Sequence, residues 1–392
     1  MTVAAGRGSM EGFWQTGASG PAIMDDVSER DLKQRLIDRI RSEGPISFAE
    51  FMEGALYDPE DGFYARPPIG PDGHFVTSPH VSGAFGALVA RQVGQVWDLL
   101  GKPDRMAVVE VGAGDGTLAR QILEGVAAVP ELASAVGYVA VERSGGARSY
   151  LADIGVEVRS SLEDLSVEGC VLANEVIDNL PFRRVRRRAG RTVEVLVGAD
   201  DGRLVEVEGE PDPRLLERLP AQPEEGEERP VSEGAAAFVH QAAAALRRGY
   251  CFLFDYGFAA GERPGPVHAY RDHRVLADTL EDPGGRDVTA AVDLQALAQE
   301  AAAAGLSVWG PITQRDALLG LGFRTWMSGL RSRQAEAQLA RAPREAARLY
   351  SERQRASILV DPAKLGGLRL LVFGTRGLPP PAAALGDRRS GC

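Results

Sequence analysis

The chain is organised around the stretch Val108-Val109-Glu110-Val111-Gly112-Ala113-Gly114-Asp115-Gly116-Thr117-Leu118-Ala119. Its apolar part, which runs from Met106 to Val111, predicts a buried parallel strand. The three glycines that follow permit a tight turn and a close approach of the backbone to a ligand. A segment compatible with a helix begins at Thr117. We therefore expect a strand, a turn and a helix, with a flat or extended ligand lying on the turn.

The spacing of the glycines argues against a dinucleotide as that ligand. In a G-x-G-x-x-G fingerprint counted from Gly112, the third glycine comes one residue early, at Gly116, and Thr117 holds the expected place. The pattern Glu110-x-Gly112-x-Gly114-x-Gly116 resembles the first motif of class I methyltransferases, which bind S-adenosylmethionine at the switch point of a doubly wound sheet. The resemblance implies that Glu110 faces the methionyl ammonium and that the turn amides lie near the carboxylate. The alternative is a purely structural glycine turn.

Length, charge and cysteine content narrow the class of protein. With 392 residues, 44% of them hydrophobic, the chain is long enough for one large α/β domain with an insertion, or for two domains. The net charge of −11 argues against nucleic acid as the main partner, because phosphate contacts need basic side chains. Cys170 and Cys251 lie in apolar runs, which indicates buried thiols in a reducing compartment. Because no run suits a membrane span or a signal peptide, we expect a cytoplasmic protein.

Several short motifs follow one another in a characteristic order. They are Pro45-Ile46-Ser47-Phe48 with Phe51-Met52, Leu56-Tyr57-Asp58-Pro59 with Gly62-Phe63-Tyr64, Phe75-Val76-Thr77-Ser78-Pro79, Asn174-Glu175-Val176-Ile177-Asp178-Asn179-Leu180-Pro181, Phe254-Asp255-Tyr256-Gly257, Asp287-Val288-Thr289-Ala290 and Thr313-Gln314. Over about residues 45–323 this set resembles the MidA family of class I methyltransferases. That family includes a mitochondrial complex I assembly factor that methylates an arginine of a complex I subunit.

The resemblance implies an α/β fold, namely a class I, Rossmann-like, seven-stranded methyltransferase sheet with an N-terminal helical lid and inserted antiparallel β and helical caps. The expected divisions run in order along the chain: a disordered tail (1–25), the helical lid (26–100), the cofactor-binding half of the core (101–181), the antiparallel cap (182–230), the second half of the core (231–375) with a helical insertion (316–360), and a disordered tail (376–392). Capping residues predict helix starts after Ser47, Ser232 and Asp293.

Two further segments are expected to bind the cofactor. Glu142 follows the predicted second strand, where a carboxylate can accept two hydrogen bonds from the ribose hydroxyls. Its alternative role is a solvated strand end. The resemblance places the adenine beside Ser161 and Leu162, after the third strand.

The fourth strand, Cys170 to Ala173, ends in polar residues at the edge where open α/β sheets bind their ligands. Asn174, Glu175 and Asp178 are therefore candidates for cofactor and acceptor binding, although capping and turning the chain before Pro181 is the simpler alternative. Asp255 stands at the equivalent end of the fifth strand. We expect catalytic roles for these four side chains.

Substrate contacts are expected from residues in the family motifs and in a loop that follows the fifth strand: Thr77, Ser78, His80, Tyr256 and His273. Two positions depart from the family pattern. Ala291 stands where the family carries a histidine, and His80 stands where it more often has an acidic residue. Both departures concern the methyl acceptor more than the cofactor.

The region from residue 182 to 210 predicts three antiparallel strands, the first of which carries the arginine-rich run Arg183-Arg184-Val185-Arg186-Arg187-Arg188. Such a run suits either an acidic partner or a solvated sheet face, and the second is the more common arrangement. Residues 210–230, which are rich in Pro and Glu, predict a surface loop.

These features together predict an S-adenosylmethionine-dependent methyltransferase that acts by in-line displacement, without a metal, on a protein arginine. If the acceptor is a guanidinium, carboxylates such as Glu175, Asp178 or Asp255 must orient it. Two alternatives stay open: a small-molecule methyltransferase of secondary metabolism, and a non-catalytic assembly factor that binds the cofactor for structure. The expected partner is a protein or small-molecule acceptor rather than nucleic acid or membrane, and a homodimer stays open.

Overall fold

The computed structural model describes residues 25–65, 77–219, 222–272 and 274–386. A seven-stranded sheet forms its centre, in the order β16-β17-β10-β5-β2-β3-β4. The strands are β2 (Met106–Val111), β3 (Val136–Val141), β4 (Glu157–Arg159), β5 (Val167–Asn174), β10 (Leu246–Asp255), β16 (Ser307–Thr313) and β17 (Arg369–Gly374). Only β17 runs antiparallel to its neighbours in this sheet. The predicted Rossmann-like methyltransferase sheet is confirmed.

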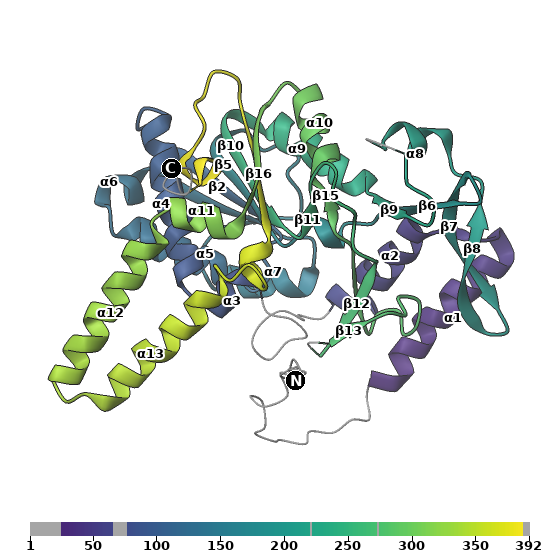
Figure 1. Ribbon diagram of the computed structural model, residues 1–392, viewed down its shortest axis with the longest axis horizontal. Coiled ribbons are helices and arrows are strands. Elements are labelled where there is room, and N and C mark those ends of the chain that lie inside the picture. Colours follow the sequence, from purple (N-terminus) through teal and green to yellow (C-terminus); the bar gives the residue numbers. More distant parts are fainter. Residues whose placement is uncertain (1–24, 66–76, 220–221, 273, 387–392) are drawn as a thin grey trace, which may run out of the picture.

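Helices cover both faces of this sheet (Figure 1). Val108 and Cys170 pack into one apolar layer with α4 (Ala84–Leu99) and α5 (Thr117–Ala127). Val109 and Val171, one residue further along each strand, pack into the opposite layer with α9 (Glu233–Ala245) and α10 (Leu294–Ala303). Successive residues of a strand point to opposite faces, so two short apolar runs supply both layers. The order of connections reverses between β2 and β5, which places the ligand-binding edge beside the glycine turn.

The first elements of the chain pack into an apolar cluster of their own, except the last of them, which contacts helices of the core. These elements are α1 (Asp25–Glu43), β1 (Ile46–Ser47), α2 (Phe48–Tyr57), η1 (Phe63–Ala65) and α3 (Ser78–Val81). Ser47 and Glu50 form the predicted capping box of α2. The expected lid over residues 26–100 also takes in α4, which packs into an apolar layer of the central sheet. The first tail, 1–25, lies outside the described residues except for Asp25.

The inserted cap is a second, antiparallel sheet beside α1 and α2 (Figure 1). It contains β6 (Arg183–Arg188), β7 (Arg191–Asp200), β8 (Arg203–Gly209) and β9 (Glu228–Val231), and β1 joins its edge. Phe48 of α2 packs against Phe182 with ring centroids 5.4 Å apart. The loop expected at 210–230 is partly wrong, because it contains α8 (Pro213–Glu217) and the start of β9.

Four of the five arginines of β6 pair with glutamates of the same sheet. Arg183 binds Glu194 through two hydrogen bonds of 2.6 Å. Arg184, which is 5% exposed, lies 2.6 Å from both Glu206 and Glu228. Because these charges are satisfied within the sheet, the arginine run acts as internal structure rather than as a free basic surface.

The remaining elements complete the layers and the periphery. They are α6 (Pro130–Ala135), α7 (Gly145–Ala152), η2 (Ile177–Asn179), β11 (Gly257–Phe258), β12 (His268–Arg271), β13 (Arg274–Leu276), β14 (Asp287–Thr289), β15 (Val292–Asp293) and η3 (Leu365–Gly367). The predicted helical insertion consists of α11 (Gln314–Gly320), α12 (Phe323–Leu339) and α13 (Pro343–Ile358). No helix within the described ranges is long and apolar enough to cross a membrane.

The second expected tail, 376–392, is wrong as far as the structure describes it. Residues 376–386 follow a defined path that includes α14 (Ala382–Leu385), and Ala383 is fully buried. The Tyr250 hydroxyl donates a 2.7 Å hydrogen bond to the carbonyl of Pro379. The apolar face of the alanine run therefore docks on the core, which a composition rich in proline concealed.

Candidate active site

A cavity of about 560 Å³ opens at the carboxyl ends of β2, β3 and β5. This volume is typical of a site for a small molecule or cofactor. Most of the residues expected to bind the cofactor line it: Glu110, Gly112, Gly114, Glu142, Ser161, Leu162 and Asn174. Thr77, His80 and Glu175 line it too. Residues from strands far apart in the sequence thus meet at the predicted edge of the sheet.

The glycines of the turn are required chiefly by packing within the protein. Gly112, Gly114 and Gly116 have φ angles of 69°, 54° and 74°, a region that favours glycine. A β-carbon at Gly112 would lie 2.4 Å from Cγ2 of Val176. One at Gly116 would lie 2.0 Å from Cδ1 of Ile154, and Gly116 does not line the cavity. Its close approach is therefore to a neighbouring side chain, and the expected cofactor contact of Gly116 stays a prediction.

Glu142 holds the glycine turn in place. Its Oε2 accepts a 2.9 Å hydrogen bond from the backbone N–H of Gly114, and its Oε1 accepts a 2.8 Å bond from Ser144. The carboxylate lines the cavity, so a ligand hydroxyl can still reach its remaining lone pairs. Glu142 therefore combines the predicted ligand-facing position with a structural role.

Glu110 is buried at the floor of the cavity, with 4% of its surface exposed. Its Oε2 accepts a 2.6 Å hydrogen bond from the hydroxyl of Tyr138. Burial raises the pKa of Glu110 to about 8, although the bond from Tyr138 opposes this shift. A cationic group bound in the cavity would stabilise the ionised carboxylate, which suits the ammonium of the methionyl end.

Asn174 supplies an unused acceptor to the same cavity. Its Nδ2 donates a 3.2 Å hydrogen bond to Glu175, whereas its buried Oδ1 receives none from the described residues. An unsatisfied buried acceptor is costly, so its presence marks a place where a ligand donor belongs. The residues present therefore fit S-adenosylmethionine: Glu110 and Asn174 for the ammonium, Glu142 for the ribose, and Leu162 as apolar surface for the ring.

Four buried carboxyls surround the ends of β5 and β10. They belong to Glu175, Asp178, Asp255 and Asp287. Burial raises the pKa of Glu175 to about 7 and that of Asp178 to about 6. Burial, with the neighbouring charge of Asp178, also raises the pKa of Asp287 to about 7 and that of Asp255 well above its usual value. No group of three or more such side chains within the described ranges is arranged to hold a metal ion.

Of these carboxyls, Glu175 lies closest to the predicted chemistry, because it lines the cofactor cavity. Its backbone has a φ of 55°, which is uncommon for a residue with a side chain. Its Oε1 accepts hydrogen bonds from the N–H of Ser78 at 2.9 Å and from Asn174 at 3.2 Å. The turn after β5 thus forces the Glu175 carboxylate into the cavity, beside the unsatisfied Asn174 oxygen.

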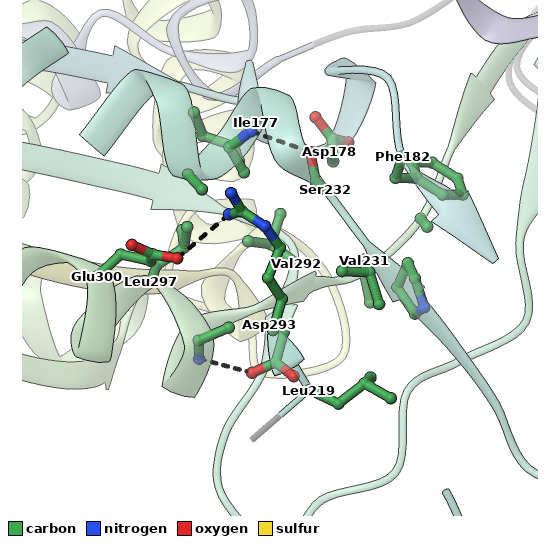
Figure 2. A pocket seen from close by; sticks show the side chains of 17 residues that line it. Ile177, Asp178, Phe182, Leu219, Val231, Ser232, Val292, Asp293, Leu297 and Glu300 are labelled. Atoms are coloured by element: carbon green, nitrogen blue, oxygen red, sulfur yellow. Dashed lines mark hydrogen bonds and ion pairs between the residues drawn. The ribbon is translucent and has the colours of Figure 1, made fainter. Parts of the chain in front are cut away.

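Asp178 lies behind this cavity rather than at its mouth. It lines a smaller cavity of about 50 Å³, and Figure 2 shows it at the upper end of that space, with Asp293 at the lower end. Its Oδ2 accepts a 2.8 Å bond from the Thr289 hydroxyl, whereas its buried Oδ1 has no hydrogen bond within the described part of the chain. Because the chain turns through η2 after β5, Asp178 does not line the cofactor cavity, and its expected role in acceptor binding stays a prediction.

Asp255 has a structural position. Its Oδ2 accepts hydrogen bonds from the backbone N–H groups of Val176 and Ile177, at 3.2 and 2.8 Å, and its Oδ1 accepts one from Tyr256 at 2.8 Å. The side chain is fully buried and does not line the cofactor cavity. Asp255 fixes the turn that presents Glu175. Its geometry therefore supports a structural role and not the direct catalytic role expected from the sequence.

The expected substrate residues lie in different places. His80 bonds to Asp115 (3.1 Å) and Thr77 (2.8 Å), which ties α3 to the glycine turn. Ser78 is fully buried, and its hydroxyl donates to Gln314, so it is a structural link. Tyr256 is 46% exposed and lies outside both cavity linings. His273 lies outside the described residues.

Two tyrosines that were not predicted as site residues also line the cavity. Tyr57 and Tyr64 stack with centroids 5.5 Å apart, and their hydroxyls donate to the carbonyl of Asn179 and to Asp287. Both belong to a motif quoted for the family resemblance, and the density of aromatic residues at a turn was the available signal. Their long-range contacts were not predictable from local pattern.

Comparisons with known proteins agree with this geometry. Residues 88–312 match a family of S-adenosyl-L-methionine-dependent methyltransferases. The mitochondrial protein arginine methyltransferase NDUFAF7 homolog of Drosophila melanogaster is 28% identical over 384 residues, which cover 86% of this chain and 82% of that protein. Human mitochondrial protein arginine methyltransferase NDUFAF7 is 28% identical over 325 residues, with 74% and 73% covered.

A crystal structure from Burkholderia thailandensis, bound to S-adenosyl-homocysteine, is 27% identical. It superposes with a TM-score of 0.83 over 96% of this chain and 100% of that one. A native structure from the same organism gives a TM-score of 0.80. The family match covers both the glycine turn and the polar end of β5, where the cavity lies. The chain therefore belongs to this family of methyltransferases, with S-adenosyl-L-methionine as its methyl donor.

Proposed function

We propose that this methyltransferase transfers its methyl group to an arginine of a protein. The observation that carries the proposal is the Glu175 carboxyl, which lines the cofactor cavity in front of three further buried carboxyls. A cluster of like charges is costly to bury unless a cation joins it. The relatives named as protein arginine methyltransferases, 28% identical over most of this chain, support the same acceptor.

The chemistry requires orientation and a proton acceptor. The donor supplies an electrophilic methyl group on a sulfonium. The guanidinium nitrogen forms the new N–C bond while the C–S bond breaks toward sulfur, and the nitrogen loses one proton. A carboxylate at Glu175 can orient the planar N–H groups and accept that proton, because a pKa of about 7 suits a general base at neutral pH.

The two alternative functions are weighed against particular residues. His80 gave one reason to expect a small-molecule acceptor, yet both of its ring nitrogens already contact Thr77 and Asp115. Ala291, the other reason, lines the smaller cavity beside Asp178 rather than the cofactor cavity. The non-catalytic alternative assigns no role to the Glu175 carboxyl in the cofactor cavity. Cytoplasmic location and a homodimer stay predictions.

The test is incubation of the purified protein with tritiated S-adenosylmethionine and native cell extract. We expect label in a protein band, and methylarginine in its acid hydrolysate. Label that passes a small-pore filter supports the small-molecule alternative, and an unlabelled extract with intact cofactor binding supports the non-catalytic one. The Glu175→Gln variant serves as the control for enzyme-dependent labelling.

A further inference from the structure

The helices α12 and α13 form an antiparallel pair that projects from the body of the molecule (Figure 1). We call residues 323–358 the basic arm. The pair has a small apolar core of its own, made by Leu330, Ala337, Ala346 and Leu349. With 17 residues in α12, the arm extends roughly 25 Å at the helical rise of about 1.5 Å per residue.

The charge of the arm is opposite to that of the rest of the protein. It contains eight arginines, no lysine and three glutamates, which gives +5. Because the whole chain carries −11, the remainder carries −16. This separation of charge indicates what kind of surface binds the arm, because a basic surface on an acidic protein attracts an acidic surface and repels a basic one.

Several of these arginines are free to bind a partner. Arg348 and Arg355 pair with Glu345 and Glu352 on the arm itself. By contrast, the side chains of Arg331, Arg333, Arg341 and Arg344 are exposed and make no hydrogen bond or ion pair among the residues that the structure describes. This arrangement differs from that of the arginines of β6, which the surrounding glutamates neutralise.

Two exposed apolar side chains stand among these charges. Leu339 is 85% exposed and Tyr350 is 51% exposed. Tyrosine and arginine are enriched in the residues that dominate protein–protein binding energies. Two such side chains offer little apolar area for insertion into a membrane, which favours a protein surface over a lipid surface.

The base of the arm lies beside the catalytic cavity. The Ser82 hydroxyl donates a 2.6 Å hydrogen bond to Glu352 of α13, and Ser82 directly follows α3. Thr77, which directly precedes α3, and His80 within α3 line the cofactor cavity. A protein held along the arm can therefore reach the site of methyl transfer at the base of the arm.

We propose that the basic arm docks an acidic face of the protein substrate, so that an arginine elsewhere on that protein reaches Glu175. The identity of the docked protein as the substrate rests on the proposed function, whereas the acidic character of the partner rests on the arm alone. The arm supplies affinity through charge, and the carboxyls around the cavity select the cationic side chain.

The test compares two variants of the full-length protein that each lose four exposed arginines. The arm variant carries Arg331→Gln, Arg333→Gln, Arg341→Gln and Arg344→Gln. The matched control carries Arg105→Gln, Arg120→Gln, Arg191→Gln and Arg203→Gln, all on the body. Equal affinity of both variants and the wild type for S-adenosyl-homocysteine shows that the fold and the cavity are intact.

Binding is measured by fluorescence anisotropy with a labelled oligo-glutamate peptide. We expect the wild type to bind it with an affinity that falls as salt rises, the arm variant to bind roughly tenfold more weakly, and the control to change by less than about twofold. Equal losses in the two variants would overturn the proposal. Tighter binding to phosphatidylglycerol vesicles or duplex DNA, or salt-sensitive dimerisation through the arm, would overturn it as well.

The labelling assay in native extract then tests whether the docked protein is the substrate. For the labelled protein, we expect the arm variant to raise KM roughly tenfold and to leave kcat nearly unchanged. An unchanged KM would overturn the proposal. If the wild type labels no protein, the proposed function and the substrate role of the partner both fail, while the peptide measurement still decides whether the arm binds acidic protein surfaces.

Discussion

The inserted antiparallel sheet and the ends of β5 and β10 both concentrate charged side chains, yet they balance them differently. In the sheet, arginines pair with glutamates of neighbouring strands, and Arg184 contacts two carboxylates at 2.6 Å although it is almost fully buried. At the strand ends, Glu175, Asp178, Asp255 and Asp287 gather without a basic side chain bonded to any of them in the described ranges.

This difference distinguishes charged residues that stabilise the fold from charged residues that can bind a ligand. A charge that is satisfied by its neighbours adds to the fold and offers little to a ligand. Carboxyls of like charge that are buried together raise each other's pKa and gain from a cation that arrives later. The arginine run is conspicuous in the sequence, but the scattered carboxyls, brought together by the fold, form the better candidate site.

The largest expected effect comes from Glu175→Gln. It keeps the shape of the side chain and removes the charge that orients a guanidinium, so the single-turnover transfer rate should fall roughly a hundredfold, as when one positioned electrostatic contact is lost. Affinity for S-adenosyl-homocysteine should change by less than about twofold. Transfer at the wild-type rate would show that another carboxyl orients the acceptor, with Asp178 the next to test.

Glu142→Ala should weaken binding of S-adenosyl-homocysteine by about 1.5 to 3 kcal/mol, the range for hydrogen bonds to a charged group. Because Glu142 also accepts bonds from Gly114 and Ser144, thermal stability without ligand should fall too. Calorimetry and thermal unfolding measure the two effects. Glu157→Ala, in the neighbouring strand β4, is the matched control and should leave the affinity intact; a loss of stability with unaltered affinity would make Glu142 purely structural.

Glu228→Gln tests the inserted antiparallel sheet, and we expect it to change stability and not the reaction. It removes a carboxylate from Arg184 and Arg186 while Glu206 remains beside both. The free energy of unfolding should fall by about 1 to 3 kcal/mol, and the methyl-transfer rate should not change. Urea unfolding and single-turnover transfer measure the two quantities. A slower transfer step in a folded variant would mean that the sheet also serves the reaction.

Glu110→Gln should change the dependence of stability on pH. A carboxyl whose pKa is raised on folding holds its proton longer in the folded state, so the wild type loses stability as the pH rises from about 4.5 to about 8. The variant lacks this loss and should gain about 3 kcal/mol relative to the wild type between pH 5 and pH 8, because each pH unit over which only the folded state holds the proton costs about 1.4 kcal/mol. Urea unfolding at both pH values checks the sign; a parallel decline in both proteins would contradict the raised pKa.

Much of the fold was predictable because its signals are local. The apolar run at β2, the glycine turn and the caps at Ser47, Ser232 and Asp293 depend on residues close in sequence, and the structure confirms each of them. The docking of Ala383 on the core was not predictable, because a composition rich in proline and alanine does not reveal which face is buried.

The candidate site was predictable in position and less so in detail. The carboxyl ends of parallel strands meet at one edge, so Glu110, Glu142 and Asn174 could be placed together before the structure was known. The direction of each side chain depends on the turn after β5. That turn sends Glu175 into the cavity and Asp178 behind it, and it is fixed by Asp255, a contact across 78 residues of sequence.

The most direct test is calorimetric titration of the protein, with S-adenosyl-homocysteine bound, using methylguanidinium as a minimal acceptor. At pH 8 the carboxyl of Glu175 is ionised, and at pH 6 it is mostly protonated, since its pKa is about 7. We predict binding that is roughly tenfold tighter at pH 8, release of protons on binding near pH 7, and loss of both in Glu175→Gln. Binding that is independent of pH and equal in the variant would contradict the account.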